Sequence, residues 1–407
     1  MGIIYNIEEA IKNSAFNVLQ EPIKMILDNQ KEAYEQNSII SKFFVMKTTD
    51  RYMEEYRSQT SMDGFKPTED MEVAPISDFE ESYFQQFTFQ IWTNSFVISK
   101  QTMEDGKLMD VDMRANAFIK GYNRTREQYA VSMIGAALGN TYEDLKITDK
   151  SGKGMDTVTG DIEGNRQQYF SKLHKTVKLR DGRKQITQSN KFYATIDFTD
   201  GVTPDIEEKV LDVLGQVESI MSTYKDDKGN ITPVEVDTIF VPQNYRLIDI
   251  LTRGLKSRYG ASMDGNGINT QYGKYKIVVS PYLSAIEGFR GEEFRDEEDN
   301  KHVDNGIILA SSSRNREGLG AVWFDRKPLE VRSYKDDKTE ANVWAGRARW
   351  GAGFGDFRAM SYIAFPGEGA SAKTKSDATL ITPITTGVKA VNVVNSETKP
   401  VNTKTIA

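Results

Sequence analysis

Apolar residues recur at intervals of three and four along residues 108–140, and this spacing predicts one long amphipathic helix. Asp110 or Asp112 is placed to cap its first amides, and Gly139-Asn140 supplies a stop signal. At 1.5 Å per residue the helix would span roughly 40 Å, a length that suits an architectural role. We expect a helix over 110–139 whose core residues include Phe118, Ile119, Tyr122, Met133 and Ile134.

The opposite face of this helix is polar, and we expect it to be exposed to solvent. The side chains on that face are Lys120, Asn123, Arg124, Glu127 and Gln128.

Residues 58–107, before the helix, have the pattern of an extended β-hairpin. Aromatic and polar residues alternate from Tyr83 to Trp92, and Asp63-Gly64 and Asp105-Gly106 are turn signals. A hairpin cannot cover so many aromatic side chains by itself, so we expect a partner surface to cover them. The candidates for this contact are Phe84, Phe87, Phe89 and Trp92.

Residues 1–57 contain two short helical patterns separated by Pro22. Neither is long enough to be stable alone. The segment is therefore predicted to be an arm, which either docks on another molecule or packs on its own chain.

Residues 201–320 alternate helices and strands, which indicates an α/β lobe. A helix is expected to begin at Thr203-Pro204-Asp205, where proline takes the first helical position and acids follow in the first turn. The strands expected in and before this lobe cover residues 176–179, 192–198, 236–241, 275–280 and 307–310, and a second helix runs through 247–255.

Residues 321–366 return to antiparallel strands, at 321–324, 329–334, 343–350 and 357–365, and a glycine-rich hairpin is expected at 351–356. Apolar Trp344, Ala348 and Trp350 alternate with Arg347 and Arg349, so one face of the third strand is apolar and the other cationic. The two arginines form either a solvated face or ion pairs with another subunit. Residues 367–407 are predicted to be a tail that orders against a neighbour.

Composition narrows the class of protein. The 407 residues exceed what one hydrophobic core organises, so at least two lobes are expected. The absence of cysteine excludes disulfides and thiolate metal sites. The net charge of -7 and the pI of about 5.3 do not favour nucleic-acid binding, and no apolar run has the length of a membrane span.

Motifs for catalysis are missing, and we expect no enzyme activity, cofactor or metal. Residues 150–154 lack the spacing of a phosphate-binding loop, and the glycines at 351–355 lack that of a dinucleotide fingerprint. The two histidines, His174 and His302, lie far apart in the sequence. The acidic run at 292–299 is most simply a solvated loop, with a cation site as the alternative.

The order of these parts resembles the major capsid protein of tailed double-stranded-DNA bacteriophages, which has the Hong-Kong-ninety-seven-type fold. Local runs add to the resemblance, which covers roughly residues 58–366. They are Tyr169-Phe170-Ser171 with His174 and Gln188-Ser189-Asn190, Asp227-Lys228-Gly229-Asn230, Phe240-Val241-Pro242, residues 278–283, Val322-Trp323-Phe324, residues 347–351, and Phe357-Arg358.

The resemblance implies an α+β fold in six parts. They are an N-terminal arm (1–57), an extended loop that lies over a neighbouring subunit (58–107), a peripheral domain with its spine helix (108–200), an axial domain (201–320), closing peripheral strands (321–366) and a C-terminal tail (367–407). Its candidate interface residues are Phe84, Phe87, Phe89, Trp92, Arg347, Arg349 and Trp350.

The resemblance also implies a function: self-assembly, as pentamers and hexamers, into the icosahedral head around the phage genome. Portal and decoration proteins would be partners, packaged DNA would be close without specific binding, and no membrane is involved. Assembly would take place in the bacterial cytoplasm and the product would be the virion. The arm begins near Met1, so we expect a separate scaffold protein instead of a cleaved segment.

Some proteins of this family join a loop lysine to an asparagine of another subunit. Lys66, Lys100 and Lys107 are available, but no motif marks a pair, and we predict no crosslink. Two alternatives stay open: an encapsulin-like compartment that holds protein cargo, and a two-lobed carboxylate-dependent enzyme whose lid is the loop 58–107.

Overall fold

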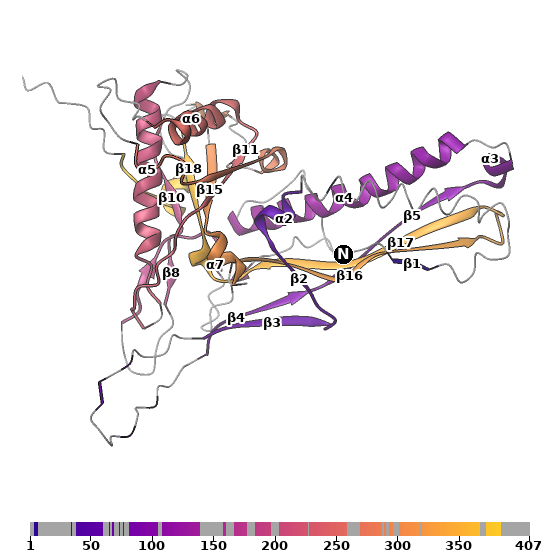
Figure 1. Ribbon diagram of the computed structural model, residues 1–407, viewed down its shortest axis with the longest axis horizontal. Coiled ribbons are helices and arrows are strands. Elements are labelled where there is room, and N and C mark those ends of the chain that lie inside the picture. Colours follow the sequence, from indigo (N-terminus) through magenta and orange to yellow (C-terminus); the bar gives the residue numbers. More distant parts are fainter. Residues whose placement is uncertain are drawn as a thin grey trace, which may run out of the picture.

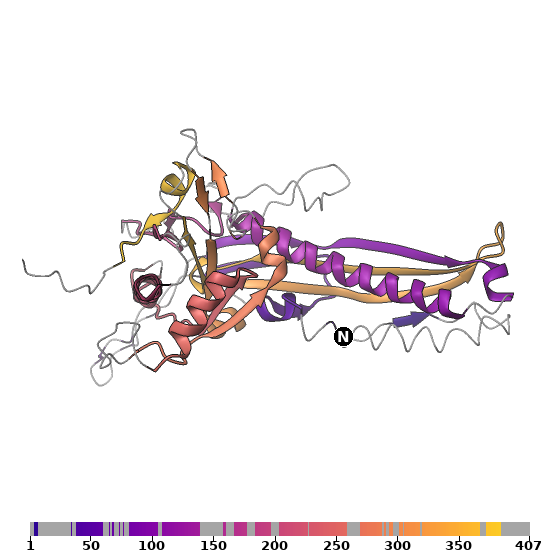
Figure 2. The same cartoon turned by 90° about the horizontal axis from the view of Figure 1, so that it is seen from above.

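The long helix predicted from the sequence is the longest element of the fold. In the computed structural model it runs over Leu108–Leu138 (α4), beside a sheet in the order β1-β16-β17-β5 (Figures 1 and 2). These strands cover Ile4–Asn6, Ala321–Lys335, Asn342–Phe354 and Gln90–Ile98, and β2 (Val45–Thr48) also pairs with β16. We call this helix and sheet the elongated lobe.

A second sheet of six strands forms the compact lobe, in the order β12-β11-β15-β18-β10-β19. Helices α5 (Pro204–Ser222) and α6 (Tyr245–Lys256) lie against it (Figure 1). Thr203 and Asn244 cap these two helices through their side-chain oxygens. The strands cover Lys276–Ser280, Thr238–Pro242, Asn305–Ala310, Met360–Phe365, Lys191–Tyr193 and Thr379–Leu380.

The remaining elements are short. They are α2 (Ile40–Phe43), β3 (Met53–Gln59), β4 (Glu81–Thr88), α3 (Lys100–Glu104), β6 (Val158–Thr159), β7 (Gln167–Gln168), β8 (His174–Lys175), β9 (Thr187–Gln188), η2 (Pro281–Ala285), β13 (Glu293–Arg295), β14 (Lys301–Val303), α7 (Ser312–Arg316), η3 (Phe357–Ala359) and α8 (Ala372–Asp377).

The structure describes residues 4–6, 34, 38–59, 65, 67–68, 73, 76, 81–104, 108–138, 158–159, 167–176, 184–196, 203–226, 228–258, 269–286, 289, 293–295, 301–303, 305–317, 320–366 and 372–383. Several sequence expectations fall outside these residues. They are most of the arm helices, the turns at 63–64 and 105–106, the helix stop at 139–140, the glycine-rich stretch 150–154, and the tail beyond 383. No helix within the described residues has the length and apolar character needed to cross a bilayer.

The compact-lobe sheet is buried on both faces, because alternate residues of its strands enter two different cores. Ile239 and Leu309 pack with α5 and α6. Phe240, Ile308 and Tyr362 point the other way and join the core of the elongated lobe. The two lobes are therefore held by one shared sheet.

The expected boundaries at 201, 321 and 367 do not follow the sheets. Strand β18, expected among the closing peripheral strands, pairs with β15 and β10 in the compact lobe. Strand β19 of the expected tail pairs in parallel with β10, so the tail up to this point packs on its own chain. Sequence pattern identified β18 as a strand but carried no information about its pairing partner.

The glycine-rich run was predicted to be a hairpin, and this was wrong. Strand β17 continues through Gly351 to Phe354 and pairs with the start of β16, which itself is one strand of 15 residues. A Cβ on Gly351 would lie 2.6 Å from the carbonyl oxygen of Thr88. The glycine therefore permits the close approach of a neighbouring segment within a strand.

The polar face predicted for α4 was also partly wrong. Asn123 and Glu127 are buried, at 7% and 0% exposure, while Lys120 and Arg124 are exposed. Residues 38–48 cause this burial, because they pack on α4 and on the start of β16. The described part of the arm, residues 38–48, thus packs on its own chain.

The acidic run was expected to be a loop, yet its first residues form β13, which pairs with β14 in a small hairpin. Within the described residues, no three histidine, aspartate or glutamate side chains are grouped closely enough to hold a metal ion.

We expect Gly346→Ala to lower the free energy of unfolding by about 2 kcal/mol, because the added methyl group would overlap the Phe118 ring of α4. Gly121 on α4 is the matched control, since a Cβ there meets nothing within 4 Å. Gly121→Ala should raise the stability by up to about 1 kcal/mol. Chemical denaturation of both variants measures the difference, and equal stabilities would contradict this account of the helix–sheet contact.

Candidate functional site: an exposed loop, a cationic sheet face and the lobe junction

The extended loop leaves the body as an antiparallel pair of strands, β3 and β4, in which Met53 pairs with Thr88 and Glu54 with Phe87. This start differs from the expected one at residue 58. The expected end at 107 was also wrong, because β5 runs back along β17 as part of the elongated-lobe sheet. The loop proper is therefore residues 53–88.

The root of the loop is fixed by a small aromatic cluster. Phe87 and Phe89 are buried against Phe324, with ring centroids 5.3 and 5.7 Å away. Val322 completes this cluster on the face of the sheet opposite α4. Phe87 and Phe89 therefore anchor the loop to its own chain, which contradicts their expected role as residues that contact another subunit.

Beyond the root, the large apolar side chains that the structure describes in the loop are exposed. Phe65, Val73 and Ile76 are each described by the structure, and their exposures are 109%, 88% and 94%. Three such side chains on one loop, uncovered by the rest of the chain, are unfavourable in water. They make the loop a candidate contact surface.

Two tryptophans expected at the interface pack within the chain instead: Trp350 is buried, and Trp92 is partly buried against the same core. Trp350 is 1% exposed and stacks on Trp92 at 5.0 Å with nearly parallel rings. Tyr129 of α4 packs edge-on against Trp92. The alternation correctly placed both residues on the apolar face of their strands, but α4, not a second molecule, covers that face. The side chain of Phe84 lies outside the described residues.

Other core residues expected on α4 lie in the same layer. Phe118, Ile119, Met133 and Ile134 are all 5% exposed or less, and Tyr122 is partly buried against the core.

Arg347 and Arg349 face away from α4, since their neighbours Trp350 and Ala348 point toward it. Arg326 of β16 approaches the same place, and its guanidinium lies 5.9 Å from the Tyr52 ring. Burial lowers the pKa of Arg349, and the charges of Arg326 and Arg347 lower it further. This face is therefore a cluster of like charges.

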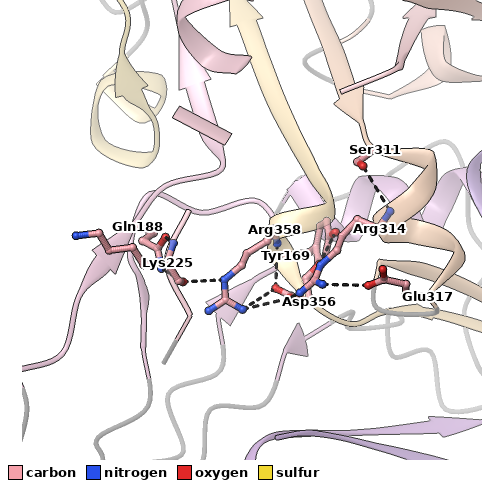
Figure 3. Close-up of polar contacts among 8 residues, drawn as sticks. All are labelled: Tyr169, Gln188, Lys225, Ser311, Arg314, Glu317, Asp356 and Arg358. Carbon is pink, nitrogen blue, oxygen red and sulfur yellow. Dashed lines mark hydrogen bonds and ion pairs between the residues drawn. The ribbon is translucent and has the colours of Figure 1, made fainter. Parts of the chain in front are cut away.

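The junction of the lobes is a buried ionic network, shown in Figure 3. Asp356 follows the last strand of the elongated lobe and caps η3, from which β18 of the compact lobe begins. Its Oδ2 accepts hydrogen bonds from Arg358 at 3.1 Å and from Arg314 at 3.2 Å. The Nε of Arg358 also donates to the carbonyl oxygen of Lys225. The network fixes the place where the chain passes from one lobe to the other.

Asp356 is ionised in this network. Burial alone would raise the pKa of its carboxyl group, but Arg358 and Arg314 outweigh burial and hold the pKa below its usual value. Asp356 is thus held as a structural counter-ion between two guanidinium groups.

Beside this network, Asn190 joins three separate segments. Its amide nitrogen donates to the carbonyl oxygens of Tyr169, Phe357 and Met360, so its Oδ1 is the acceptor. That oxygen accepts from the backbone of Ser171 and lies 3.1 Å from the Nε2 of His174. The runs that the sequence singled out at 169–174 and 188–190 therefore meet at the lobe junction.

His174 is buried and neutral there. Its ring stacks on Phe357 at 4.0 Å, and its Nε2 has two acceptors, the carbonyl oxygen of Tyr169 and Oδ1 of Asn190. The Nε2 consequently carries the proton of the neutral ring. Burial lowers the pKa of His174 to about 4. The other histidine, His302, lies in the separate hairpin β13-β14.

Glu127 is a buried acceptor that the sequence pattern did not predict. Its Oε1 accepts hydrogen bonds from Tyr34 and Ser38, each at 2.5 Å, and from the backbone of Ile39 at 3.2 Å. Burial raises the pKa of Glu127, although these bonds favour the ionised form. The only local signal was an acid beside Arg126 near the middle of a long helix.

Comparison with known proteins gives no sequence relative: no family model and no curated protein matches the chain. Similar solved structures include the capsid of cyanophage P-SCSP1u (9% identity, 82% of this chain and 89% of that chain, TM-score 0.45). The capsid of Ralstonia phage GP4 is 11% identical over 79% of this chain and 86% of that chain, with a TM-score of 0.48. A virus-like particle from Pyrococcus furiosus is 7% identical over 84% and 98%, with a TM-score of 0.40. At these values the likeness assigns no partner and no activity to this chain.

Removing the Glu127 carboxylate should release the arm. We expect Glu127→Ala to lower the free energy of unfolding by about 3 kcal/mol, because three donors lose a buried acceptor. Protease cleavage near Tyr34 should also become faster. Lys120→Ala, on an exposed position of the same helix, should change stability by less than about 0.5 kcal/mol. Unchanged cleavage of Glu127→Ala would contradict the role of this carboxylate.

His174 should make the fold sensitive to acid. Its folded pKa of about 4 lies below the unfolded value near 6.5, so its contribution is complete above pH 6.5 and is lost as the pH falls toward 4. The loss should reach about 3 kcal/mol, measured by denaturation at a series of pH values. His174→Gln keeps a donor but does not titrate, and it should flatten the profile between pH 4 and 6.5. A profile as steep as that of the parent protein would assign the acid sensitivity to other groups.

Proposed function

We propose that this chain is a structural protein that assembles with copies of itself into a closed shell, as the head protein of a tailed phage does. The observation that carries the proposal is the loop 53–88. Its root is anchored in the chain's own core, and yet Phe65, Val73 and Ile76 lie almost completely in solvent. An interface between copies would bury them.

The form of the body supports the same proposal. The elongated lobe places a 31-residue helix along a sheet, and the compact lobe lies at one end of it (Figure 1). Such a body presents a long edge and a separate lobe to its neighbours. Rings of five and six copies around the compact lobe, with loops laid across adjacent copies, would give each exposed surface a partner.

The proposal includes the contents and companions of the shell. Double-stranded DNA would be enclosed without specific binding, in agreement with the net charge of -7. A separate scaffold protein, a portal and decoration proteins would take part in assembly. The site of assembly would be the bacterial cytoplasm and the product the virion.

An encapsulin-like compartment is the second candidate, because an exposed loop would serve a shell around protein cargo equally well. Shells purified from the native source separate the two by their contents, DNA in one case and a packaged protein in the other. For the enzyme alternative, the described residues supply no supporting feature. The most buried carboxylate of the lobe junction, Asp356, is bound by two arginines and capped into η3.

A test of shell assembly targets the three exposed loop residues. We expect the triple variant Phe65→Ser, Val73→Ser, Ile76→Ser to keep the fold but to reduce shell yield at least about tenfold, because the apolar area buried on assembly is lost. The conservative triple variant Phe65→Leu, Val73→Ile, Ile76→Val should assemble as the parent does. Light scattering and negative-stain microscopy, with and without a co-expressed scaffold, measure the yield. A parent protein that stays monomeric under both conditions would refute the proposed function.

A further inference from the structure

Glu127 is a carboxyl group that the fold buries without an ion pair of its own. Its side chain, on α4, is 0% exposed. The guanidinium of the preceding Arg126 is engaged by Asp325, whose carboxylate lies 3.1 Å away. Within the described residues, Oε2 of Glu127 has no hydrogen-bond partner. A buried carboxylate without a counter-ion is unfavourable, and uptake of a proton removes the charge that causes the cost.

The described charged and titratable groups that face Glu127 lie on α4, on η2 and in the arm. On α4, Arg124 is exposed to solvent, and Arg126 lowers the pKa of Glu127 although it is already paired. On η2, burial raises the pKa of Tyr282, and the charge of Glu127 raises it further. In the arm, burial and the same charge raise the pKa of Tyr34. Both tyrosines therefore remain neutral, and neither supplies a positive charge.

The arm is held on α4 in two different ways. The four apolar residues within 39–44 are each 3% exposed or less, so this part is anchored in the core. Tyr34 precedes the anchor, and its hydroxyl group lies 2.5 Å from Oε1 of Glu127 and 3.0 Å from the carbonyl oxygen of Asn123. Ser38 donates to the same Oε1 at 2.5 Å. Glu127 therefore lies where the arm passes from its anchored part to a part held by polar contacts.

The charge of Glu127 affects this contact in two opposite ways. Burial favours the neutral carboxyl group and outweighs the hydrogen bonds from Ser38, Tyr34 and the backbone of Ile39, so the pKa of Glu127 is raised. The neutral group keeps Oε1 as an acceptor, and the donors of the arm retain their partner without a buried charge. We propose that docking of the arm at Tyr34 is coupled to proton uptake by Glu127, so that the arm loosens when this carboxyl group ionises. The coupling concerns a single chain and does not depend on the proposed function.

The sign of the pH dependence follows from the two states of the arm. When Tyr34 withdraws, water reaches Glu127 and its pKa returns toward the ordinary value of 4.5. Docking is therefore strongest below pH 4.5 and weakens as the pH rises through the raised pKa of the docked state. Between these two values the docking constant should fall about tenfold for each pH unit. His174 has the opposite sign, because its contribution to stability is lost as the pH falls.

The variant Glu127→Gln tests the coupling, because its amide keeps an acceptor oxygen and cannot ionise. Protease cleavage near Tyr34 is measured from pH 4.5 to about pH 8 in the parent and in this variant. The ratio of the two rates cancels the pH dependence of the protease itself. We expect the ratio to rise by up to about tenfold for each pH unit and to level off above the raised pKa. Tyr34→Ala gives the cleavage rate of the released arm at each pH.

A ratio that does not change with pH, or one that falls as the pH rises, would overturn the proposal. Thermal unfolding at each pH separates release of the arm from loss of the whole fold. If Glu127→Gln does not fold, the carboxyl group of Glu127 can be titrated directly by NMR in the parent and in Tyr34→Ala. The pKa should be higher in the parent, where the docked arm excludes water, and equal values would overturn the proposal as well.

Discussion

The shared sheet of the compact lobe is the constraint on which the structure depends. Successive residues of β11, β15 and β18 enter alternate cores, so the sheet cannot move relative to either lobe without exposing one of them. Phe43 packs at 4.9 Å from Phe240 and at 6.2 Å from Phe354, and so links the arm, the compact lobe and the elongated lobe. A body joined in this way behaves as one unit when it meets a neighbour.

Close packing of Phe118 over Gly346 and a buried ion pair between Arg126 and Asp325 hold α4 against its sheet. Gly346 leaves room for Phe118, which lets the helix approach the strands closely. Arg126 donates to both oxygens of Asp325 at 3.1 Å, and its guanidinium lies 5.1 Å from the Trp323 ring. The indole nitrogen of Trp323 donates to the same carboxylate. Because the guanidinium and the carboxylate are paired with each other, burial within an aromatic layer does not leave an unpaired charge.

The described residues fall into two groups: those that bind within the chain and those that are left exposed. The hydrogen bonds of Asp356 at the lobe junction and of Glu127 Oε1 are made within the chain, and they hold the arm, the helix and the two lobes together. Phe65, Val73 and Ile76 of the loop are exposed, and burying them against a partner would gain free energy.

The sequence by itself determined several of the elements. The three-and-four spacing set the long helix nearly to the residue, proline and threonine marked the start of α5, and alternation placed Trp344, Ala348 and Trp350 on one face of β17. These features could be predicted because they depend on neighbours a few residues apart. The chain order also carried the α+β architecture and its resemblance to phage head proteins.

Only the tertiary structure decided which surface each element buries. Trp350 was expected at an interface and is core, and Trp92 is partly buried against it, because α4 covers that face. Glu127 was expected in solvent and is buried, because Tyr34 and Ser38 reach it. Periodicity shows that a side chain has an apolar or a polar surrounding, but not which distant segment supplies it. The pairing of β18 with β10 depends on contacts between residues far apart in the chain. The packing of the whole fold fixes such contacts.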